Sequence, residues 1–306
     1  MDYFLDKSHG KFGFSAELEP ALVILPGTGE RIGFETSDEV YAQLHEHHDI
    51  AKLTVQINPV TGPVYVEGAC TGDALAVTIH EIRLKDRGWA VSLPGVRALQ
   101  HVMGSDMFTR RVPIDDDGVH VTERHVFAPL PMIGCIGTAP ARGTNSTVMP
   151  SYSQGGNMDL TDCRPGSIVY LPVEVDGGYL SIGDIHAIMA EGESSFVAIE
   201  AEGIAVVSID LVKGMNLRAP RVETAQDWIF VGLGDPVQDS ITRGYEDMFA
   251  FLTEEHDWSP SDAYAVMSAV GHSSLGGPTG SAVPDPLHPM TARGAVTVHR
   301  LPKRVL

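Results

Sequence analysis

Short segments in which apolar and polar residues alternate dominate the first two thirds of the chain. Ala74–Leu84 and Tyr179–Ile188 alternate with a period of two, which predicts β-strands with one buried face. Asp176-Gly177-Gly178 precedes the second of these and favours a tight hairpin, because Asp and Gly tolerate positive φ. The predicted strands are Pro20–Pro26, Arg31–Thr36, Lys52–Asn58, Pro63–Glu67, Ala74–Leu84, Val119–Phe127, Ser167–Val175, Tyr179–Ile188 and two runs within Phe196–Val212.

The last third has a helical period instead. Apolar residues from Ile241 to Leu252 recur on one face of a helix, which would begin at Asp239 or Ser240. A second helix is predicted from Ser259 to Gly271, and a final strand over Ala295–Leu301. The pattern predicts an α+β, mainly β protein, with two packed β layers and a helical pair near the C-terminus. We expect one unit over 1–306, β-rich over about 1–235 and helical with a final strand over about 236–306.

Charge and composition exclude several classes of partner. The 306 residues include 21 Lys and Arg against 40 Asp and Glu, a formal net charge of −19. This charge repels phosphate backbones and anionic lipids, so we expect no nucleic acid partner and no membrane association. The first residues, MDYFLDKSHGKFGF, lack the pattern of a secretory signal, and the 3 cysteines are widely spaced. We therefore expect a cytoplasmic protein.

The densest polar cluster follows an apolar strand. Asp184 and His186 are two residues apart, so both side chains would lie on one face of a strand. Carboxylate oxygen and imidazole nitrogen both bind Zn²⁺ and similar ions, and Glu193 lies just beyond. A structural Asp–His hydrogen bond would give the same spacing, so both interpretations stay open.

Two further segments carry candidate chemistry. Gly155 and Gly156 permit a ligand to approach the backbone, or a turn with positive φ, and Asn157 and Asp159 follow with an amide and a carboxylate. An Asx-turn is the alternative. Glu67 ends an otherwise apolar strand, where burial would raise its pKa and suit a general acid or base. A Glu on the solvent side of the strand is the alternative, and the pattern alone favours it.

Other polar groups are weaker candidates. Asp38 lies at the end of a predicted strand. His45 and His48 would share a helix face but lack the H-E-x-x-H spacing of zinc peptidases, so a polar surface turn is the alternative. Cys135 lies in an apolar, glycine-rich run, which indicates a core thiol more than a nucleophile. The chain contains no G-x-S-x-G or Walker A motif.

Several short sequence blocks occur in a fixed order, and together they indicate a protein family more specifically than any single block does. The blocks are Asn58–Ala69, Pro131–Gly137, Gly155–Asp159, Gly166–Val173, Gly183–His186 and Gly192-Glu193. In these blocks the chain resembles the acetamidase/formamidase family, from about residue 10 to the end. The resemblance implies hydrolysis of short amides such as formamide or acetamide to a carboxylate and ammonia. It also implies a β-sandwich-like core with a smaller α/β part near the C-terminus, a divalent metal ion, and a cytosolic homodimer or higher homo-oligomer.

The resemblance assigns roles to the candidate residues. Asp184 and His186 match the family's G-D-x-H block, Asn157 and Asp159 match G-G-N-M-D, and Glu67 matches the first block. The expected site therefore comprises the metal ligands Asp184, His186, Asp159 and Asp38, the catalytic residues Glu67 and Asn157, and the substrate-binding residues Gly155, Gly156 and Glu193. Zn²⁺ suits a mixed Asp/His site best, and Ca²⁺ or another divalent ion stays open.

Some departures from the family pattern leave other functions open. Ile185 and Met189 stand where family members commonly have glycine and glutamine. This loss of polarity would suit an amidase of the same fold that acts on a larger or more apolar amide. A non-catalytic binding protein that retains the fold is a second alternative. An amidase with a cysteine nucleophile, at Cys135 or Cys163, is a third.

Overall fold

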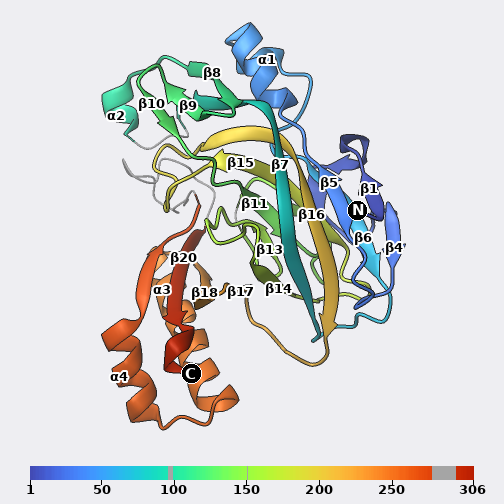
Figure 1. Cartoon of the computed structure of the whole chain (residues 1–306), viewed down its shortest axis with the longest axis vertical. Helices are drawn as coiled ribbons and strands as arrows, with labels where there is room; N and C mark the ends of the chain where they lie inside the picture. The colour runs from blue at the N-terminus through green and yellow to red at the C-terminus, as the bar shows by residue number, and fades with distance from the viewer. Residues whose placement is uncertain (96–98, 150, 278–293) are drawn as a thin grey trace.

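Two long antiparallel strands run side by side through the molecule. They are β7 (Ala74–Ser92) and β16 (Ile199–Val212), and they pair from Ala74 with Val212 to Trp89 with Glu200 (Figure 1). The computed structural model describes residues 1–95, 99–149, 151–277 and 294–306. Four other described strands pair directly with one of these two, so the pair forms the frame of the fold.

The strands form two layers around a shared core. β7 and β16 also pair with β14 (Ile168–Pro172) and β5 (Ile32–Glu35) in one layer. In the other, β15 (Leu180–Ile188) lies between β6 (Val60–Val66) and β11 (Met132–Gly137). One hydrophobic cluster contains buried residues from both layers, among them Val77, Val207, Ile136 and Ile182. The predicted mainly β fold is confirmed.

The remaining elements are short. They are β1 (Tyr3–Leu5), β2 (Gly10–Lys11), β3 (Gly13–Phe14), β4 (Leu22–Ile24), α1 (Glu39–His47), α2 (Gln100–Met103), β8 (Phe108–Asp115), β9 (Gly118–Thr122), β10 (His125–Phe127), β12 (Asn145–Ser146) and β13 (Gly155–Asn157), with 3-10 turns at Lys7–His9, Ile50–Lys52 and Lys303–Val305. Strands β8, β9 and β10 form an antiparallel arm that begins where β8 pairs with the end of β7.

The C-terminal part continues the first layer. β17 (Arg221–Glu223) pairs with β14, and β18 (Asp227–Gly234), β20 (Ala295–Pro302) and β19 (His272–Leu275) follow in turn. Helix α3 (Val237–Ala250), the π-turn Phe251–Glu255 and α4 (Pro260–Val270) lie together at this end (Figure 1). Their buried apolar side chains pack against this sheet extension in a second hydrophobic cluster. The two predicted helices are therefore present, although α3 begins after Pro236, before the predicted Asp239.

Two strand predictions are wrong: Val119–Phe127 forms two paired strands, β9 and β10, in place of one, and the segment before β6 forms none. Lys52–Asn58 contains no strand, because the chain leaves a 3-10 turn at Lys52 and stays irregular until β6 begins. The alternating residues Leu53, Val55 and Ile57 pack instead against the buried face of α1, which includes Leu44. A buried face without a strand partner thus produced the same period-two pattern.

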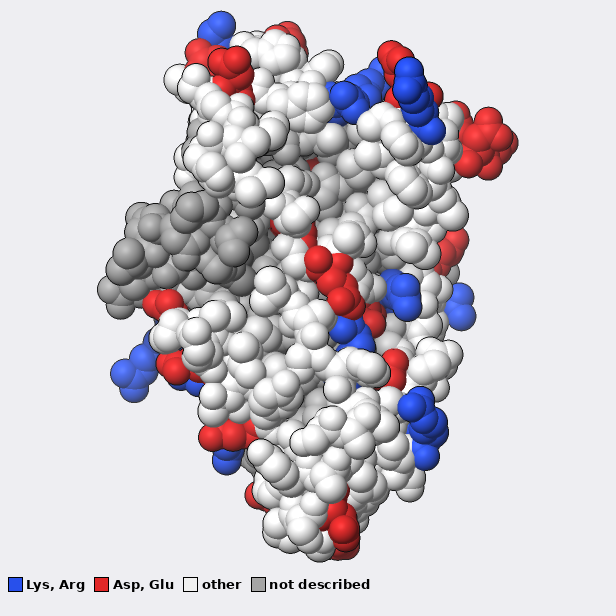
Figure 2. Space-filling model, turned by 90° about the vertical axis from the view of Figure 1, so that its left-hand side faces the viewer, with Lys and Arg blue, Asp and Glu red and all other residues white. Residues whose placement is uncertain are grey.

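Charged side chains are spread over the surface. On the face in Figure 2, acidic side chains occur in small groups separated by uncharged surface. The acidic excess therefore does not form one continuous patch on this face.

Among the described residues, no helix combines the length and the apolar character that crossing a bilayer requires.

Candidate active site

A buried group of titratable side chains lies where the two layers join. His186 of β15 pairs in register with Glu200 of β16, so their side chains are cross-strand neighbours. The His186 Nε2 atom is 3.4 Å from Glu200 Oε2 and 3.5 Å from Asp184 Oδ1. Two acids therefore lie next to one imidazole: Asp184 from the same strand, β15, and Glu200 from the neighbouring strand, β16.

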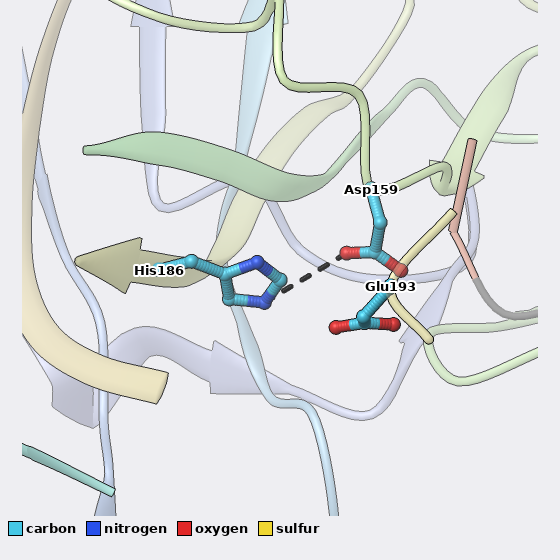
Figure 3. Close-up of side chains that lie close together, drawn as sticks. All are labelled: Asp159, His186 and Glu193. Carbon is cyan, nitrogen blue, oxygen red and sulfur yellow. Dashed lines mark ion pairs between the residues drawn. The ribbon is translucent and has the colours of Figure 1, made fainter. Parts of the chain in front are cut away.

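Two more carboxylates reach the same imidazole from loops. Asp159 follows β13, and its Oδ1 atom is 3.8 Å from His186 Nε2. Glu193 lies in the turn between β15 and β16. Figure 3 shows the side chains of Asp159, His186 and Glu193 converging. Their ligand atoms lie within 4.8 Å of one another, as do those of Asp184, His186 and Glu200. We call these five residues the carboxylate–histidine cluster.

The backbone around the cluster is strained. Asp159, Asp184 and Glu193 have φ values of 47°, 58° and 36°, in the left-handed region that favours glycine. Asn58 and Phe196, which line the adjacent cavity, have φ values of 51° and 62°. Such conformations persist only where the surrounding structure enforces them, and they concentrate at functional sites. The fold therefore holds these side chains in fixed positions.

The cluster carries more negative charge than it can neutralise. Burial raises the pKa of Asp159 well above its usual range, and the neighbouring Asp184 raises it further. Burial likewise raises the pKa values of Glu193 and Glu200. Burial would lower the pKa of His186, but the carboxylates of Glu200 and Asp184 raise it well above the usual value. One imidazolium cannot balance four buried carboxylates, so the site favours a bound cation.

Several buried polar atoms of the site have no hydrogen-bond partner among the described residues. They are both carboxylate oxygens of Asp159, both ring nitrogens of His186, the Asn157 Oδ1 atom and the Gln154 Nε2 atom. Asp159 and His186 are each only 1% exposed. Unpaired buried acceptors are costly, and metal coordination is one way to satisfy them. Mixed oxygen and nitrogen donors at this spacing fit a divalent metal ion.

A small cavity lies over the cluster. It has a volume of about 140 Å³ and is lined on its polar side by Asp159, Asp184, Glu193, Glu200 and Asn157. Tyr41 of α1 and Asn58 also line it, and the Tyr41 hydroxyl donates to Asn58 Oδ1 at 3.4 Å. Burial raises the pKa of Tyr41 well above its usual value, so its hydroxyl stays a hydrogen-bond donor.

The structure brings five of the predicted site residues together. Asp159, Asp184 and His186, predicted as ligands, lie in the cluster with Glu193, and Asn157 lines the cavity. Asp38 does not join them. Its Oδ2 atom accepts hydrogen bonds from Trp89 Nε1 at 2.6 Å and Arg87 Nε at 3.2 Å. Burial would raise the pKa of Asp38, but the bonds from Trp89 and Arg87 lower it, as expected for a structural carboxylate.

Glu67 is also far from the cluster. Val60, at the start of β6, pairs with Gly183 beside the site, whereas Glu67 is an exposed residue just past the other end of β6. Seven residues of strand separate these points by about 20 Å. We therefore correct the assignment of Glu67 as the general base, because the residue that ends this strand faces solvent.

The paired glycines serve the backbone. Gly155 and Gly156 have φ values of 102° and 130° and pair with Gly137 and Ile136 of β11. Neither is among the described residues that line the cavity. They allow β13 to approach β11 closely and so position Asn157, which pairs with Cys135. Their predicted contact with substrate has no support in this arrangement.

The remaining candidates lie outside the cavity lining. His45 and His48 are at the end of α1, with their Nδ1 atoms 3.1 Å and 3.5 Å from the Thr109 hydroxyl. Cys135 and Cys163 are fully buried, and burial raises the pKa of each thiol. Neither thiol is therefore suited to act as a nucleophile. Ile185 packs in the core, so it does not border the cavity as its position in the motif suggested.

Sequence reasoning missed Glu200, Tyr41 and Asn58. Glu200 and Glu202 are two residues apart in an otherwise apolar strand. This pattern indicates buried acids, so Glu200 could have been found from the sequence. Tyr41 had no such signal, because it reaches the cavity only through the packing of α1. Asn58 donates from Nδ2 to Asp184 Oδ2 at 3.2 Å and so fixes one ligand candidate.

Fold and site together define a two-layer β protein with a buried carboxylate–histidine centre. The chain is 31% identical to a predicted acetamidase/formamidase from Thermoanaerobacter tengcongensis, with a TM-score of 0.85 over 100% of this chain and 97% of that one. The model of the Acetamidase/Formamidase family matches residues 141–270. The chain therefore belongs to the acetamidase/formamidase family.

Curated relatives are more distant. A formamidase of Methylophilus methylotrophus is 28% identical over 217 residues, which cover 52% of each chain. An acetamidase of Mycolicibacterium smegmatis is 26% identical over 266 residues, which cover 65% of this chain and 64% of the relative. The chain thus spans less than two thirds of the length of the curated relatives that it matches.

Gly134 of β11 makes room for the cluster. A methyl group there would collide with Asp159 Oδ1 and would lie 2.7 Å from Asp184 Oδ2. We expect Gly134→Ala to displace both carboxylates, to lower the content of any divalent metal that the cluster holds, and to lower kcat/KM about 10²-fold. Gly10→Ala is the matched control, because the nearest atom to its added methyl group is a backbone oxygen at 3.1 Å. Unchanged metal content in Gly134→Ala, measured by mass spectrometry, would contradict this role.

Proposed function

We propose that this protein is a metal-dependent amidohydrolase that cleaves a small amide to a carboxylate and ammonia. The observation that carries the proposal is that the buried carboxylate of Asp159, which lines a small cavity, and the neighbouring imidazole of His186 both lack a hydrogen-bond partner among the described residues. Asp184, His186, Asp159 and Glu200 would hold the ion, and Zn²⁺ suits this donor set best. Membership of the family supports the reaction class.

The chemistry needs an activated water, a stabilised oxyanion and a proton for the leaving amine. A divalent ion held by Asp184, His186, Asp159 and Glu200 would supply Lewis-acid chemistry, by lowering the pKa of water towards about 7 and by polarising the carbonyl group. Asn157 lines the cavity, and its side-chain amide can donate a hydrogen bond to the carbonyl oxygen as it gains charge, whereas the Tyr41 hydroxyl donates to Asn58 and so orients that side chain. The oxygen of water bonds to the carbonyl carbon, the C–N bond breaks, and the nitrogen leaves as ammonia after it gains a proton.

Glu193 replaces Glu67 as our candidate for the general base. It lines the cavity over the cluster and also an apolar groove beside it, so its carboxylate lies next to the space that the substrate would occupy. Glu193 takes the proton of the attacking water and returns it to the nitrogen. We expect Glu193→Gln to lower kcat about 10²-fold while the other cluster residues keep the metal. A variant that retains wild-type kcat would exclude Glu193 from this role.

Ammonia release and metal removal test the whole proposal. We expect purified protein to contain a divalent metal and to release ammonia from at least one small amide. Dialysis against a chelator should abolish turnover and lower the thermal midpoint, because four buried carboxylates would then repel one another. Added Zn²⁺ should restore both. Full activity in metal-free protein would reject metal dependence, and a purified protein that holds no metal and releases no ammonia even after Zn²⁺ is added would favour the non-catalytic alternative.

The cellular setting is also part of this proposal. The three unpaired cysteines suit a reducing compartment, so we expect a cytoplasmic enzyme. The family resemblance leads us to expect a homodimer or a higher homo-oligomer, which light scattering of the purified protein would test.

A further inference from the structure

The cavity over the carboxylate–histidine cluster is largely apolar apart from the cluster itself. Leu44, Ile57, Leu93, Met149, Phe196 and Val197 contribute most of the remaining described lining. They come from α1, from the irregular segment before β6 and from three loops. If the carbonyl carbon of an amide lies at the cluster, its acyl substituent must occupy the space that these side chains enclose.

The volume of this space limits the acyl group. The cavity measures about 140 Å³. An engineered apolar cavity of about 150 Å³ binds benzene, a ring of six carbons. Formamide, with only a hydrogen on its carbonyl carbon, would leave most of this apolar lining without a contact. A long alkyl chain exceeds this volume and would have to extend beyond the cavity.

We propose that the preferred substrates are primary amides with a compact apolar acyl group of about three to five carbons, such as isobutyramide. This proposal rests on the proposed amidohydrolase function and names its substrate class. It assigns the apolar lining as the determinant of specificity.

Phe196 is the lining residue that we expect to set the size limit. Its φ of 62° is unusual for a bulky side chain, and its backbone N–H donates to the Glu193 carbonyl oxygen at 2.7 Å. Glycine would adopt this conformation without strain, so contacts of the aromatic ring offset the strain of keeping phenylalanine there. The same short turn therefore carries a cluster carboxylate and one wall of the acyl pocket.

A series of amides tests the substrate class. We would measure kcat/KM by ammonia release from formamide, acetamide, isobutyramide, benzamide and octanamide. Each added buried carbon should raise kcat/KM about fourfold, so isobutyramide should exceed formamide about 50-fold, and octanamide should fall below isobutyramide. Highest values for formamide or acetamide would overturn this proposal alone. Ammonia from none of the five would overturn the proposed function and this substrate class with it.

Variants of Phe196 test the size limit. Phe196→Ala and Phe196→Gly should raise the ratio of kcat/KM for octanamide to that for isobutyramide about tenfold, because both enlarge the pocket. Phe196→Gly also removes the backbone strain, so it should fold at least as readily as the alanine variant. Phe249→Ala is the matched control, because Phe249 is a half-buried phenylalanine that packs at the C-terminal cluster. An unchanged ratio in both Phe196 variants, with wild-type thermal midpoints, would overturn the assignment of Phe196.

Discussion

Replacement of His186 by alanine is expected to remove the bound metal and to lower kcat/KM by at least about 10³-fold. His186 belongs to both groups of three potential ligands, so its loss leaves neither group complete. It is also the only cationic group among the five cluster residues. Without it, four carboxylates face one another in a buried site, and their repulsion should weaken the fold as well as the chemistry.

His80→Ala is the control for this variant. His80 lies on β7, and its Nε2 atom is 2.8 Å from the Ser208 hydroxyl, so it is a hydrogen-bonded histidine outside the cluster. We expect it to keep the metal and the activity. Metal content measured by mass spectrometry and ammonia release measured on the same samples compare the two variants. A His186→Ala protein with a full complement of metal would refute the ligand assignment.

Local sequence patterns predicted where several strands lie but not how far each extends. β15 was predicted to its last residue from the alternation of its sequence, although all but two of its residues are buried and exposure does not distinguish its two faces. β7 was predicted only to Leu84, yet it continues to Ser92. The polar run after Leu84 breaks the alternation, and pairing with β16 and β8 extends the strand regardless. Pairing between distant segments has no local signature, so the length of the frame strands could not be predicted.

The site divides in the same way. Asp184 and His186 could be predicted because their spacing is local, and Asp159 because it belongs to a recognisable block. Glu200 joins the cluster only through the register of β15 with β16. Glu67 and Asp38 were misplaced for a related reason, since an acid at a strand end can face solvent, a structural partner or a site. Only the tertiary structure separates these three environments.

The other large effect is expected at the junction of the C-terminal part with the sheet. Arg221 of β17 donates to Asp247 of α3 through Nε at 3.0 Å and through Nη2 at 2.7 Å. Both side chains are less than 10% exposed. The guanidinium also lies over the rings of Phe230 and Phe251. Asp247→Ala would leave this buried cation without its main partner, so we expect a loss of about 3 kcal/mol in the free energy of unfolding.

Glu255→Ala serves as the control, because Glu255 contacts the same guanidinium from an exposed position. Its side chain is 45% exposed, and an exposed pair of this kind contributes less than about 1 kcal/mol. Because β17 connects β14 with β18, we infer that the C-terminal part unfolds together with the β-rich part. Asp247→Ala should therefore shift one cooperative denaturant transition to lower concentration. Two separate transitions would indicate that the C-terminal part is an independent unit, and an unshifted midpoint would contradict the role of the buried pair.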